Sequence, residues 1–433
     1  MAEAAAASEG RMTRQRWVIC ALLFTAVVIN YVDRQMLGVL KPFISEDLGW
    51  SETDYADIVF YFQAAYAVSY LLFGAFVDRV GAKIGYATAF FIWQIAHIAH
   101  AGASSLGQFF AVRVLLGIGE GGNFPAGIKA VTEWFPKKER ALATGIFNAG
   151  ANIGAIITPL AAPAIMLLWG WQAAFVITGL IGLLWLVAWF TLYNEPRKAR
   201  GVNAAELAHI EQDPADDEKK VGWFSVLTKR ETWAYALGKF LIDPVWWMLL
   251  FWLPDFFKKT FDLKLSIGGF QLGEIGTYSL VLAIVYIISD IGSVGGGWLS
   301  SRFMSMGWSI NQARKTTLLI FAVGALPYFL ITGITSLWVA TLLVGWLAAV
   351  HQAFSANLYT LPSDVFPRKA VGSVIGIGGM VGGIGGMVMA KSVGQVLEGM
   401  GGYGPIFAVC GGVYLLAILV VHLLTPKMEP VAL

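Results

Sequence analysis

Apolar segments of membrane-spanning length recur along almost the whole chain, and they constrain its fold more than any other feature. A helix that crosses a bilayer needs roughly 20 mostly apolar residues, and about twelve segments of this sequence reach that length. Because lipid offers no hydrogen bonds to the backbone, such segments fold as helices. We therefore expect an all-α integral membrane protein with about twelve transmembrane helices, which begin near Trp17, Tyr55, Ile84, Gly107, Arg140, Gly170, Thr232, Glu274, Thr316, Ser336, Val371 and Tyr403.

The composition fits a chain surrounded by lipid. Of the 433 residues, 57% are hydrophobic and 13% are charged, and charged side chains are costly in hydrocarbon. The net charge of +2 is too small to indicate a nucleic-acid partner. Cys20 and Cys410 lie in apolar segments near opposite ends of the chain, which argues against a structural disulfide or a cysteine metal cluster. We expect no metal and no cofactor.

Positively charged residues fall on alternate loops and at the termini, which is the positive-inside pattern of a multi-pass protein. This pattern places both termini and the long central loop in the cytoplasm, although the loop after the seventh helix is ambiguous. The apolar run after residues 1–16 is too long for a signal-peptide core, so we expect the first helix to be retained. The basic residues that carry the pattern include Arg11, Arg14, Arg16, Arg79, Lys83, Lys137, Lys138, Arg140, Arg302, Arg314, Lys315, Arg368 and Lys369.

Two related halves are indicated by a charged central stretch and by internal similarity. Residues 134–154 resemble residues 365–385, with matching glycines and a shared Phe-Pro pair. Parallel repeats of this kind place a substrate site at mid-membrane between the halves. We expect two six-helix bundles related by pseudo-twofold symmetry, arranged as an N-terminal tail over 1–16, a first bundle over 17–192, a linker over 193–230, a second bundle over 231–425 and a C-terminal tail over 426–433.

The first predicted helix carries polar and charged residues well inside the membrane. Ionisable side chains at that depth are candidates for function. Asn30 and Arg34 lie one helical turn apart and share a face, whereas Asp33 is rotated by about 100° from Arg34. We expect Arg34 to face a cavity and Asp33 to face a neighbouring helix. The alternative is that Asp33 and Arg34 form structural pairs near the extracellular end.

The fourth predicted helix repeats this pattern. Arg113 and Glu120 are two turns apart on one face, roughly 10 Å along the axis, and Asn123 follows one turn later. A buried carboxylate near an arginine can change protonation when an anion binds, so Glu120 is the first candidate for a coupling proton. Arg113 suits bidentate binding of a carboxylate, with Asn123 as a further ligand. A purely structural Arg113–Glu120 pair is the alternative.

The second and seventh predicted helices add polar groups to the proposed cavity. Lys239 and Asp243 are spaced i and i+4 beside Pro244, which interrupts the helical hydrogen bonds and suggests a gate or binding segment. Lys239 could instead extend to the cytoplasmic surface. Gln63 and Tyr66 suit a sugar-like ligand, although hydrogen bonding within the core explains either residue equally well.

A polar cluster ends the tenth predicted helix. His351, Gln352 and Asn357 are candidate substrate ligands, against the alternative that the histidine is structural. Asp290 in the eighth helix is another buried acid, for which the sequence indicates no partner. The glycine run over 376–386 follows no strand and lies in a spanning segment, so it indicates close helix packing rather than a dinucleotide site.

The loop between the second and third helices carries the sequence GAFVDRVGAK, residues 74–83. It resembles the loop signature of the major facilitator superfamily. The resemblance implies that Gly74, Asp78 and Arg79 form a conformational latch between the halves. The alternative is an ordinary charge at a helix end. The second copy has Ser301 in place of the aspartate, so we expect a weaker latch there.

Several longer blocks, among them NYVDRQML (30–37) and RVLLGIGEGGNFPA (113–126), resemble the anion:cation symporter family and, within it, bacterial hexuronate transporters. The resemblance implies proton-coupled uptake of glucuronate or galacturonate across the bacterial inner membrane by alternating access. It makes Asp33 and Glu120 the protonatable pair. Its anion-binding positions match Arg34, Tyr66 and Arg113, and Lys239 replaces a glutamine that is common in sugar-acid relatives.

Three other functions are alternatives to uptake of a hexuronate. The alternative within transport is a symporter for another organic anion, such as galactonate, tartrate or phthalate, with sodium coupling left open. A membrane enzyme needs a nucleophile, a metal set or a cofactor motif at the membrane edge, and none is evident. A sugar-acid sensor usually carries a signalling domain, whereas the central loop and C-terminus are short. We expect a monomer whose partners are protons, a small organic anion and the lipid bilayer.

Overall fold

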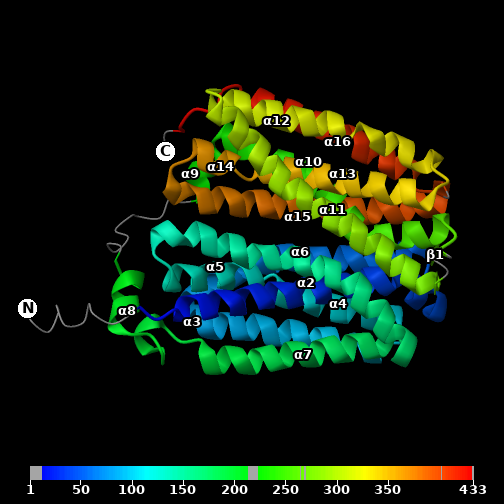
Figure 1. Ribbon diagram of the computed structural model, residues 1–433, viewed down its shortest axis with the longest axis horizontal. Helices are drawn as coiled ribbons and strands as arrows, with labels where there is room; N and C mark the ends of the chain where they lie inside the picture. Colours follow the sequence, from blue (N-terminus) through cyan, green and yellow to red (C-terminus); the bar gives the residue numbers. More distant parts are fainter. Residues whose placement is uncertain (1–11, 213–222, 264, 268–269, 401, 432–433) are drawn as a thin grey trace, which may run out of the picture.

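The computed structural model describes residues 12–212, 223–263, 265–267, 270–400 and 402–431. Its helices form two bundles that lie side by side (Figure 1). The first contains α2 (Gln15–Leu48), α3 (Glu52–Ala99), α4 (Leu106–Glu120), α5 (Asn123–Trp134), α6 (Lys137–Trp169) and α7 (Trp171–Leu192). The second contains α10 (Arg230–Thr260), α11 (Glu274–Ser305), α12 (Ile310–Gly324), α13 (Leu337–Leu358), α14 (Leu361–Val365), α15 (Arg368–Met400) and α16 (Gly404–Leu424).

Short elements connect these helices. Two helices, α8 (Ala204–Ile210) and α9 (Trp223–Leu227), lie in the central linker, and 3-10 turns cover His100–Gly102, Pro196–Lys198 and Leu326–Gly333. Between α10 and α11, the strands β1 (Leu265–Ile267) and β2 (Phe270–Leu272) pair antiparallel. This small hairpin is an addition to the expected all-α fold.

The expected membrane-spanning helices are present. Ten described segments are long and apolar enough to cross a membrane. The remaining expected spans are the second part of α3, which begins after a turn at Gly81 (φ 80°), and the α4–α5 pair. Loop serines start several helices, because the Ser51 and Ser105 side chains accept hydrogen bonds from backbone N–H groups of the first turn. These helices confirm the predicted fold class.

The bundles meet mainly through three helix pairs. Contacts join α2 to α10, α3 to α15, and α6 to α11. In chain order, the first, second and fifth spans of one bundle thus meet the seventh, eleventh and eighth spans. Exchanging the two bundles maps this set of contacts onto itself, as a pseudo-twofold axis between them requires. Mid-membrane residues of α2, α3 and α10 therefore lie near the interface.

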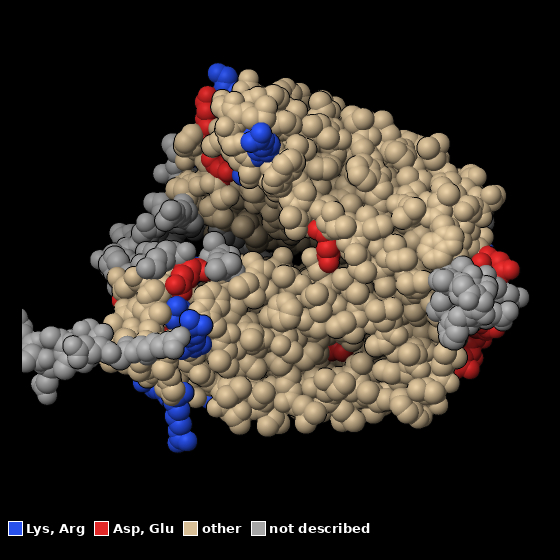
Figure 2. All heavy atoms as spheres, in the orientation of Figure 1, with Lys and Arg blue, Asp and Glu red and all other residues tan. Residues whose placement is uncertain are grey.

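Polar contacts between the bundles gather at one end. Lys41 pairs with Asp255, Lys259 with Glu52, and Lys391 with Asp57, each across the interface. This end lies opposite the two chain termini, which are both at the other end (Figure 1). Figure 2 shows the surface hollowed between the bundles on the side of the termini. The bundles are thus joined at one end and parted at the other.

The linker helix α8 is bound to the start of the first bundle. Glu206 accepts a hydrogen bond of 2.6 Å from the Thr13 hydroxyl and pairs with the Arg16 guanidinium at 3.1 Å. Although burial opposes ionisation, these hydrogen bonds lower the pKa of Glu206, so the contact is fully formed at neutral pH. The predicted division of the chain at residues 193–230 stays a prediction.

The glycine run of α15 packs closely, as expected. A Cβ on Gly385 would lie 2.5 Å from the Phe240 carbonyl oxygen and 2.9 Å from Pro244 Cγ of α10. Backbone cannot yield to such a clash without moving the helix. At Gly379, on the same helix, a Cβ would meet no atom within 4 Å. The close approach of α10 therefore requires a glycine at position 385 and not at position 379.

We expect Gly385→Ala to destabilise the protein by about 1–3 kcal/mol, because it overpacks the α10–α15 contact. Gly379→Ala is the matched control and should be neutral or more stable by about 0.5–1 kcal/mol, since alanine favours the helix. Thermal unfolding of both variants in detergent measures the difference. Equal melting temperatures would contradict the packing argument.

Candidate functional site

An arginine and a glutamate form a buried ion pair between two helices of the first bundle. Arg34 lies near the middle of α2, and its Nε donates to Glu120 Oε2 at 2.7 Å. The same guanidinium donates through an Nη atom to Asn30 Oδ1 at 3.2 Å, which confirms that the two residues share a face. Arg34 is 2% exposed and Glu120 is fully buried. Glu120 ends α4, where glycines interrupt the helix before α5.

Aromatic rings surround the Arg34 guanidinium. Its central carbon lies 4.7 Å from the ring centroid of Tyr66, 5.0 Å from that of Tyr31 and 5.5 Å from that of Trp247. Trp247 belongs to α10, so the second bundle contributes to this enclosure. Such rings stabilise the cation while leaving some of its N–H groups free of a carboxylate.

Arg113 has a different environment. It is 1% exposed, and none of its three guanidinium nitrogens has a hydrogen-bond partner among the described residues. Its central carbon lies 5.2 Å from the Phe62 ring. Glu120 pairs with Arg34 instead, so the alternative of a structural Arg113–Glu120 pair is not what the structure contains. A buried cation without an anion is costly, which makes Arg113 a strong candidate for binding an anionic ligand.

Two buried glutamines also lack partners. Both polar atoms of Gln63 and both of Gln35 are without hydrogen bonds in the described part of the chain. Gln63 Nε2 would lie 3.3 Å from a Cβ added to Gly386, so this side chain reaches the second bundle at α15. Free amide groups at a bundle interface can donate to and accept from hydroxyl groups.

Asp33 faces away from this centre, as the helical rotation predicted. Its Oδ2 accepts hydrogen bonds from Gln94 Nε2 at 2.6 Å and from Trp93 Nε1 at 3.2 Å. His97 Nε2 lies 3.2 Å from Oδ1. All four side chains are fully buried. Asp33 thus lies against the third span of the first bundle.

The second bundle holds an ion pair of its own. Lys239 Nζ lies 2.8 Å from Asp243 Oδ2 and donates to the Tyr359 hydroxyl at 2.6 Å. Lys239 is 3% exposed, so it does not extend to the surface. Pro244, next along α10, lies inside the helix as predicted.

Four further candidates are placed mostly by contacts within their own bundles. His351 Nδ1 lies 2.7 Å from the Tyr414 hydroxyl, and Asn357 donates at 2.9 Å to the Gly296 carbonyl. Asn123 Oδ1 accepts from Tyr86 at 2.5 Å. Gln352 is half-buried and follows His351 on α13. Substrate contact by these four residues stays a prediction.

The predicted latch lies where α3 turns at Gly81. A Cβ at Gly74 would meet no atom within 4 Å, so no close helix contact forms there in this conformation. Arg79 is exposed, and the side chain of Asp78 lies outside the described residues. The latch stays a prediction. Asp290 is half-buried, and among the described residues it has no hydrogen bond or ion pair.

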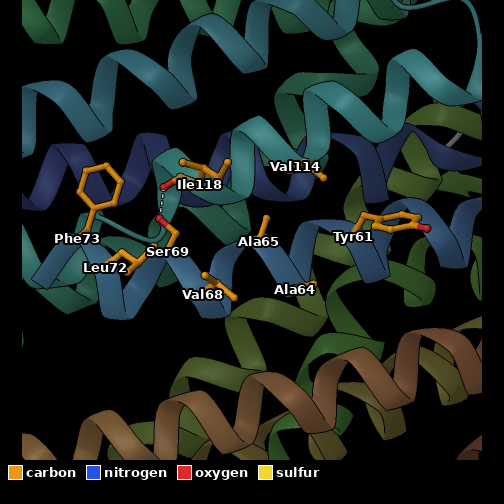
Figure 3. A pocket seen from close by; sticks show the side chains of 9 residues that line it. All are labelled: Tyr61, Ala64, Ala65, Val68, Ser69, Leu72, Phe73, Val114 and Ile118. Atoms are coloured by element: carbon orange, nitrogen blue, oxygen red, sulfur yellow. Dashed lines mark hydrogen bonds between the residues drawn. The ribbon is translucent and has the colours of Figure 1, made fainter.

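An apolar pocket of about 480 Å³ lies on α3 and α4 and is separate from these charges (Figure 3). The Ser69 hydroxyl on its wall donates to the Ile118 carbonyl oxygen. It contains none of the candidate site residues, and its lining is Tyr61, Ala64, Ala65, Val68, Ser69, Leu72, Phe73, Val114 and Ile118.

Sequence reasoning missed several residues of the site. Trp247 lies against Arg34, Tyr359 binds Lys239, and Gln94 and His97 contact Asp33. Trp247 lies eight residues after Lys239, about 80° around the helix from it, so helical spacing from Lys239 does not single it out. The partners of Asp33 have no such signal either, because they depend on how α2 and α3 pack.

Comparison with known proteins places the chain in a family. The family model described as Major Facilitator Superfamily matches residues 23–390. The "Hexuronate transporter" of Escherichia coli (strain K12) is 33% identical over 412 residues, with 94% of this chain and 93% of that protein covered. The "Galacturonate transporter" of Dickeya chrysanthemi is 30% identical, with 72% of this chain and 88% of that protein covered.

Another relative and a solved structure agree with this placement. The "D-galactonate transporter" of Escherichia coli O6:H1 is 28% identical, with 96% of this chain and 97% of that protein covered. The inward-facing, unoccupied crystal structure of a bacterial homolog of the human lysosomal transporter Spinster has a TM-score of 0.68 at 19% identity, with 95% of each chain covered. The chain is a multi-pass membrane protein and belongs to the Major Facilitator Superfamily.

Proposed function

We propose that this protein is a proton-coupled symporter that imports a hexuronate, glucuronate or galacturonate, by alternating access across the bacterial inner membrane. The buried Arg113 is the observation that carries the proposal, because its three guanidinium nitrogens lack partners among the described residues. A carboxylate of the substrate would satisfy them in bidentate fashion. The names of the relatives supply the substrate class.

The balance of buried charge supports coupling to a proton. With all groups ionised, the six charged side chains considered in the two bundles are three cations and three anions, so their charges sum to zero. A monovalent uronate therefore adds one net negative charge in a medium of low dielectric, which is unfavourable. One proton bound together with the anion restores neutrality. The groups counted are Arg34, Arg113 and Lys239 against Asp33, Glu120 and Asp243.

Glu120 is suited to couple proton binding to anion binding. Its carboxylate competes with a substrate carboxylate for Arg34. Protonation of Glu120 weakens that competition, so proton binding and anion binding favour each other. Asp33 supplies the second proton position, and Gln63 and Tyr66 supply contacts to substrate hydroxyls.

The conformation fits one step of such a cycle. Positive-inside orientation puts the termini in the cytoplasm, so the hollowed end opens inward and the joined end is extracellular. Alternating access then requires the ion pairs of the joined end to separate while the bundles rock. We propose that the protein acts as a monomer, since the site lies between bundles of one chain.

A second candidate is transport of a related organic anion such as galactonate, tartrate or phthalate. The relative named as a D-galactonate transporter favours it, because that protein matches nearly the whole chain. Sodium in place of the proton is a variant of this alternative, since carboxylates serve either ion.

The test is uptake of labelled glucuronate into proteoliposomes under an inward proton gradient, an inward sodium gradient or neither. We expect accumulation above equilibrium with the proton gradient alone. Unlabelled galacturonate should compete well, and glucose, which lacks the carboxylate, should not compete. Binding of glucose as tight as that of glucuronate would contradict the anion site, and accumulation independent of the proton gradient would contradict coupling.

A further inference from the structure

Asp33 has one carboxylate oxygen that is well supplied with donors and one that is not. Oδ2 accepts hydrogen bonds from Gln94 and Trp93, whose N–H groups are donors at any pH. Such donors favour the ionised carboxylate. Oδ1 has no hydrogen bond among the described residues, and its neighbour is His97 Nε2 at 3.2 Å. The basic group nearest to Oδ1 is therefore the His97 imidazole.

The contacts of His97 determine where its proton lies. The Thr178 hydroxyl donates its single hydrogen to the Ala174 carbonyl at 2.8 Å, so Thr178 must accept from His97 Nε2, which is 2.7 Å away. Nε2 therefore carries the hydrogen. Nδ1 keeps a free lone pair and has no partner in the described part of the chain.

A second imidazole, in the 3-10 turn that follows α3, also has one hydrogen-bonded and one free nitrogen, with the two positions exchanged. His100 Nδ1 lies 2.8 Å from the Ala96 carbonyl, and because a carbonyl can only accept, Nδ1 carries the hydrogen. Its Nε2 is free and without a partner among the described residues. The two ring centroids are 6.3 Å apart, and exposed Ser104 follows His100 by four residues. Two buried basic nitrogens thus lie between Asp33 and the joined end.

We propose that the proton assigned to Asp33 is bound at His97 Nδ1, so that an imidazolium–carboxylate pair, rather than a carboxylic acid, is the proton-loaded state. The N–H bond at Nδ1 forms as a hydronium ion gives up its proton and becomes water, and the net charge of the Asp33–His97 pair rises from −1 to 0. The ring then holds a hydrogen on each nitrogen, and the positive charge stabilises Asp33 through the 3.2 Å contact. This inference rests on the proposed proton coupling and names the atom that binds the proton.

Several charged groups surround the pair and determine when His97 can take up a proton. Asp33 of α2 is the anion that faces His97, and Arg113 of α4 is the cation that acts on both imidazoles. His100 and Glu120 are the remaining titratable neighbours, and the Glu120 carboxylate acts on Asp33. The α7 face contributes Thr178 and the apolar ring of Phe175. Arg113 opposes a second positive charge nearby. Neutralisation of Arg113 by the substrate anion therefore favours the proton on His97, which is coupling in the required direction.

His97→Gln is the test variant, because a glutamine amide keeps the N–H donor for Thr178 but cannot take up a proton. We expect it to lose gradient-driven accumulation of glucuronate in proteoliposomes while retaining counterflow exchange, and to lose the pH dependence of exchange. His422→Gln, a substitution of an exposed histidine, is the matched control and should behave as wild type.

Infrared difference spectroscopy on a pH step provides a readout that does not depend on transport. In wild type, we expect an imidazole band that disappears in His97→Gln. We expect no carboxylic acid C=O band that disappears in Asp33→Asn. A carboxylic acid band lost in Asp33→Asn would overturn the inference, as would unchanged gradient-driven accumulation in His97→Gln. If wild type itself ignored the proton gradient, the proposed function would fail instead. If His97→Gln did not fold, the wild-type and Asp33→Asn spectra would still decide.

Discussion

Replacing Glu120 by glutamine is expected to separate anion transport from proton coupling. The amide oxygen of glutamine can still accept from Arg34, so the geometry of the pair is preserved. The substituted side chain carries no charge at any pH, and the competition for Arg34 disappears. We expect gradient-driven accumulation to be lost and counterflow exchange to be retained. The pH dependence of uronate affinity, which we place at roughly 5- to 150-fold in wild type, should become smaller, because only the Asp33–His97 pair still titrates.

The measurement compares accumulation, exchange and binding over a pH series in the same proteoliposome preparation. Glu274→Gln is the control, because Glu274 is an exposed glutamate at the start of α11 and should leave all three unchanged. Loss of both exchange and accumulation in Glu120→Gln would make Glu120 a structural or ligand residue. Retention of gradient-driven accumulation would remove it from the coupling mechanism.

The fold was largely readable from the sequence, because lipid leaves helices as the solution for long apolar segments. The expected helix starts agree with the structure to within a few residues for most spans. The break between α4 and α5 was not predicted. At this break, a Cβ added to Gly121 would lie 2.8 Å from Ser69 and one added to Gly122 would lie 2.6 Å from Ala89, and a helical pattern holds no information about such neighbours. The hairpin of β1 and β2 was also not predicted, because it is a local feature of one loop.

Within one helix, the sequence also predicted the site well. Helical rotation alone placed Arg34 beside Asn30 and turned Asp33 towards another helix, and the structure agrees. Partners across helices were not predictable. Glu120 and Arg113 share a face, yet Arg34 from α2 reaches the carboxylate at 2.7 Å. Spacing along a helix fixes direction, whereas pairing between helices depends on how closely they approach.

The second bundle was the harder half to interpret. Its candidate ligands lie on helices that are buried on most sides, so periodicity did not indicate which face meets the cavity. His351 and Asn357 have partners within their bundle, and Lys239 is paired with Asp243. A polar residue in an apolar helix indicates that a partner exists. Whether that partner is protein or substrate is decided by tertiary packing.

Four charged side chains at the joined end form a cluster to which each bundle contributes one cation and one anion. The first bundle contributes Lys41 and Glu52, whose charged groups are 2.9 Å apart, and the second contributes Asp255 and Lys259, also 2.9 Å apart. Across the interface, Lys41 pairs with Asp255 at 2.7 Å and Lys259 pairs with Glu52. Each bundle therefore keeps a neutral pair of its own when the bundles separate. Opening exchanges the two cross-pairs of this cluster for water, and each of its four charges keeps a partner in its own bundle.

Asp255→Asn is expected to shift the protein towards opening at this end. Lys41 and Asp255 are each 1% exposed, so removing one charge leaves the other buried without full compensation. The cost falls on the joined state, because opening hydrates the remaining lysine. We expect a shift of about 3 kcal/mol, or roughly 150-fold, in the equilibrium between joined and separated ends. Spin labels at Ser104→Cys and Thr335→Cys, both exposed at this end, report the separation as a longer distance.

Charge symmetry makes a sharper prediction for the double variant Asp255→Asn with Lys259→Gln. This change removes the whole pair of the second bundle and leaves Lys41 with Glu52, so the joined state is neutral again. The double variant should therefore lie closer to wild type than Asp255→Asn alone, although it has lost more ion pairs. Lys198→Gln, in an exposed pair with Glu195 on the linker, controls for nonspecific effects of charge and should not move the labels. If the double variant shifted the opening equilibrium further than Asp255→Asn alone, the number of ion pairs, and not the neutrality of each bundle, would determine when this end opens.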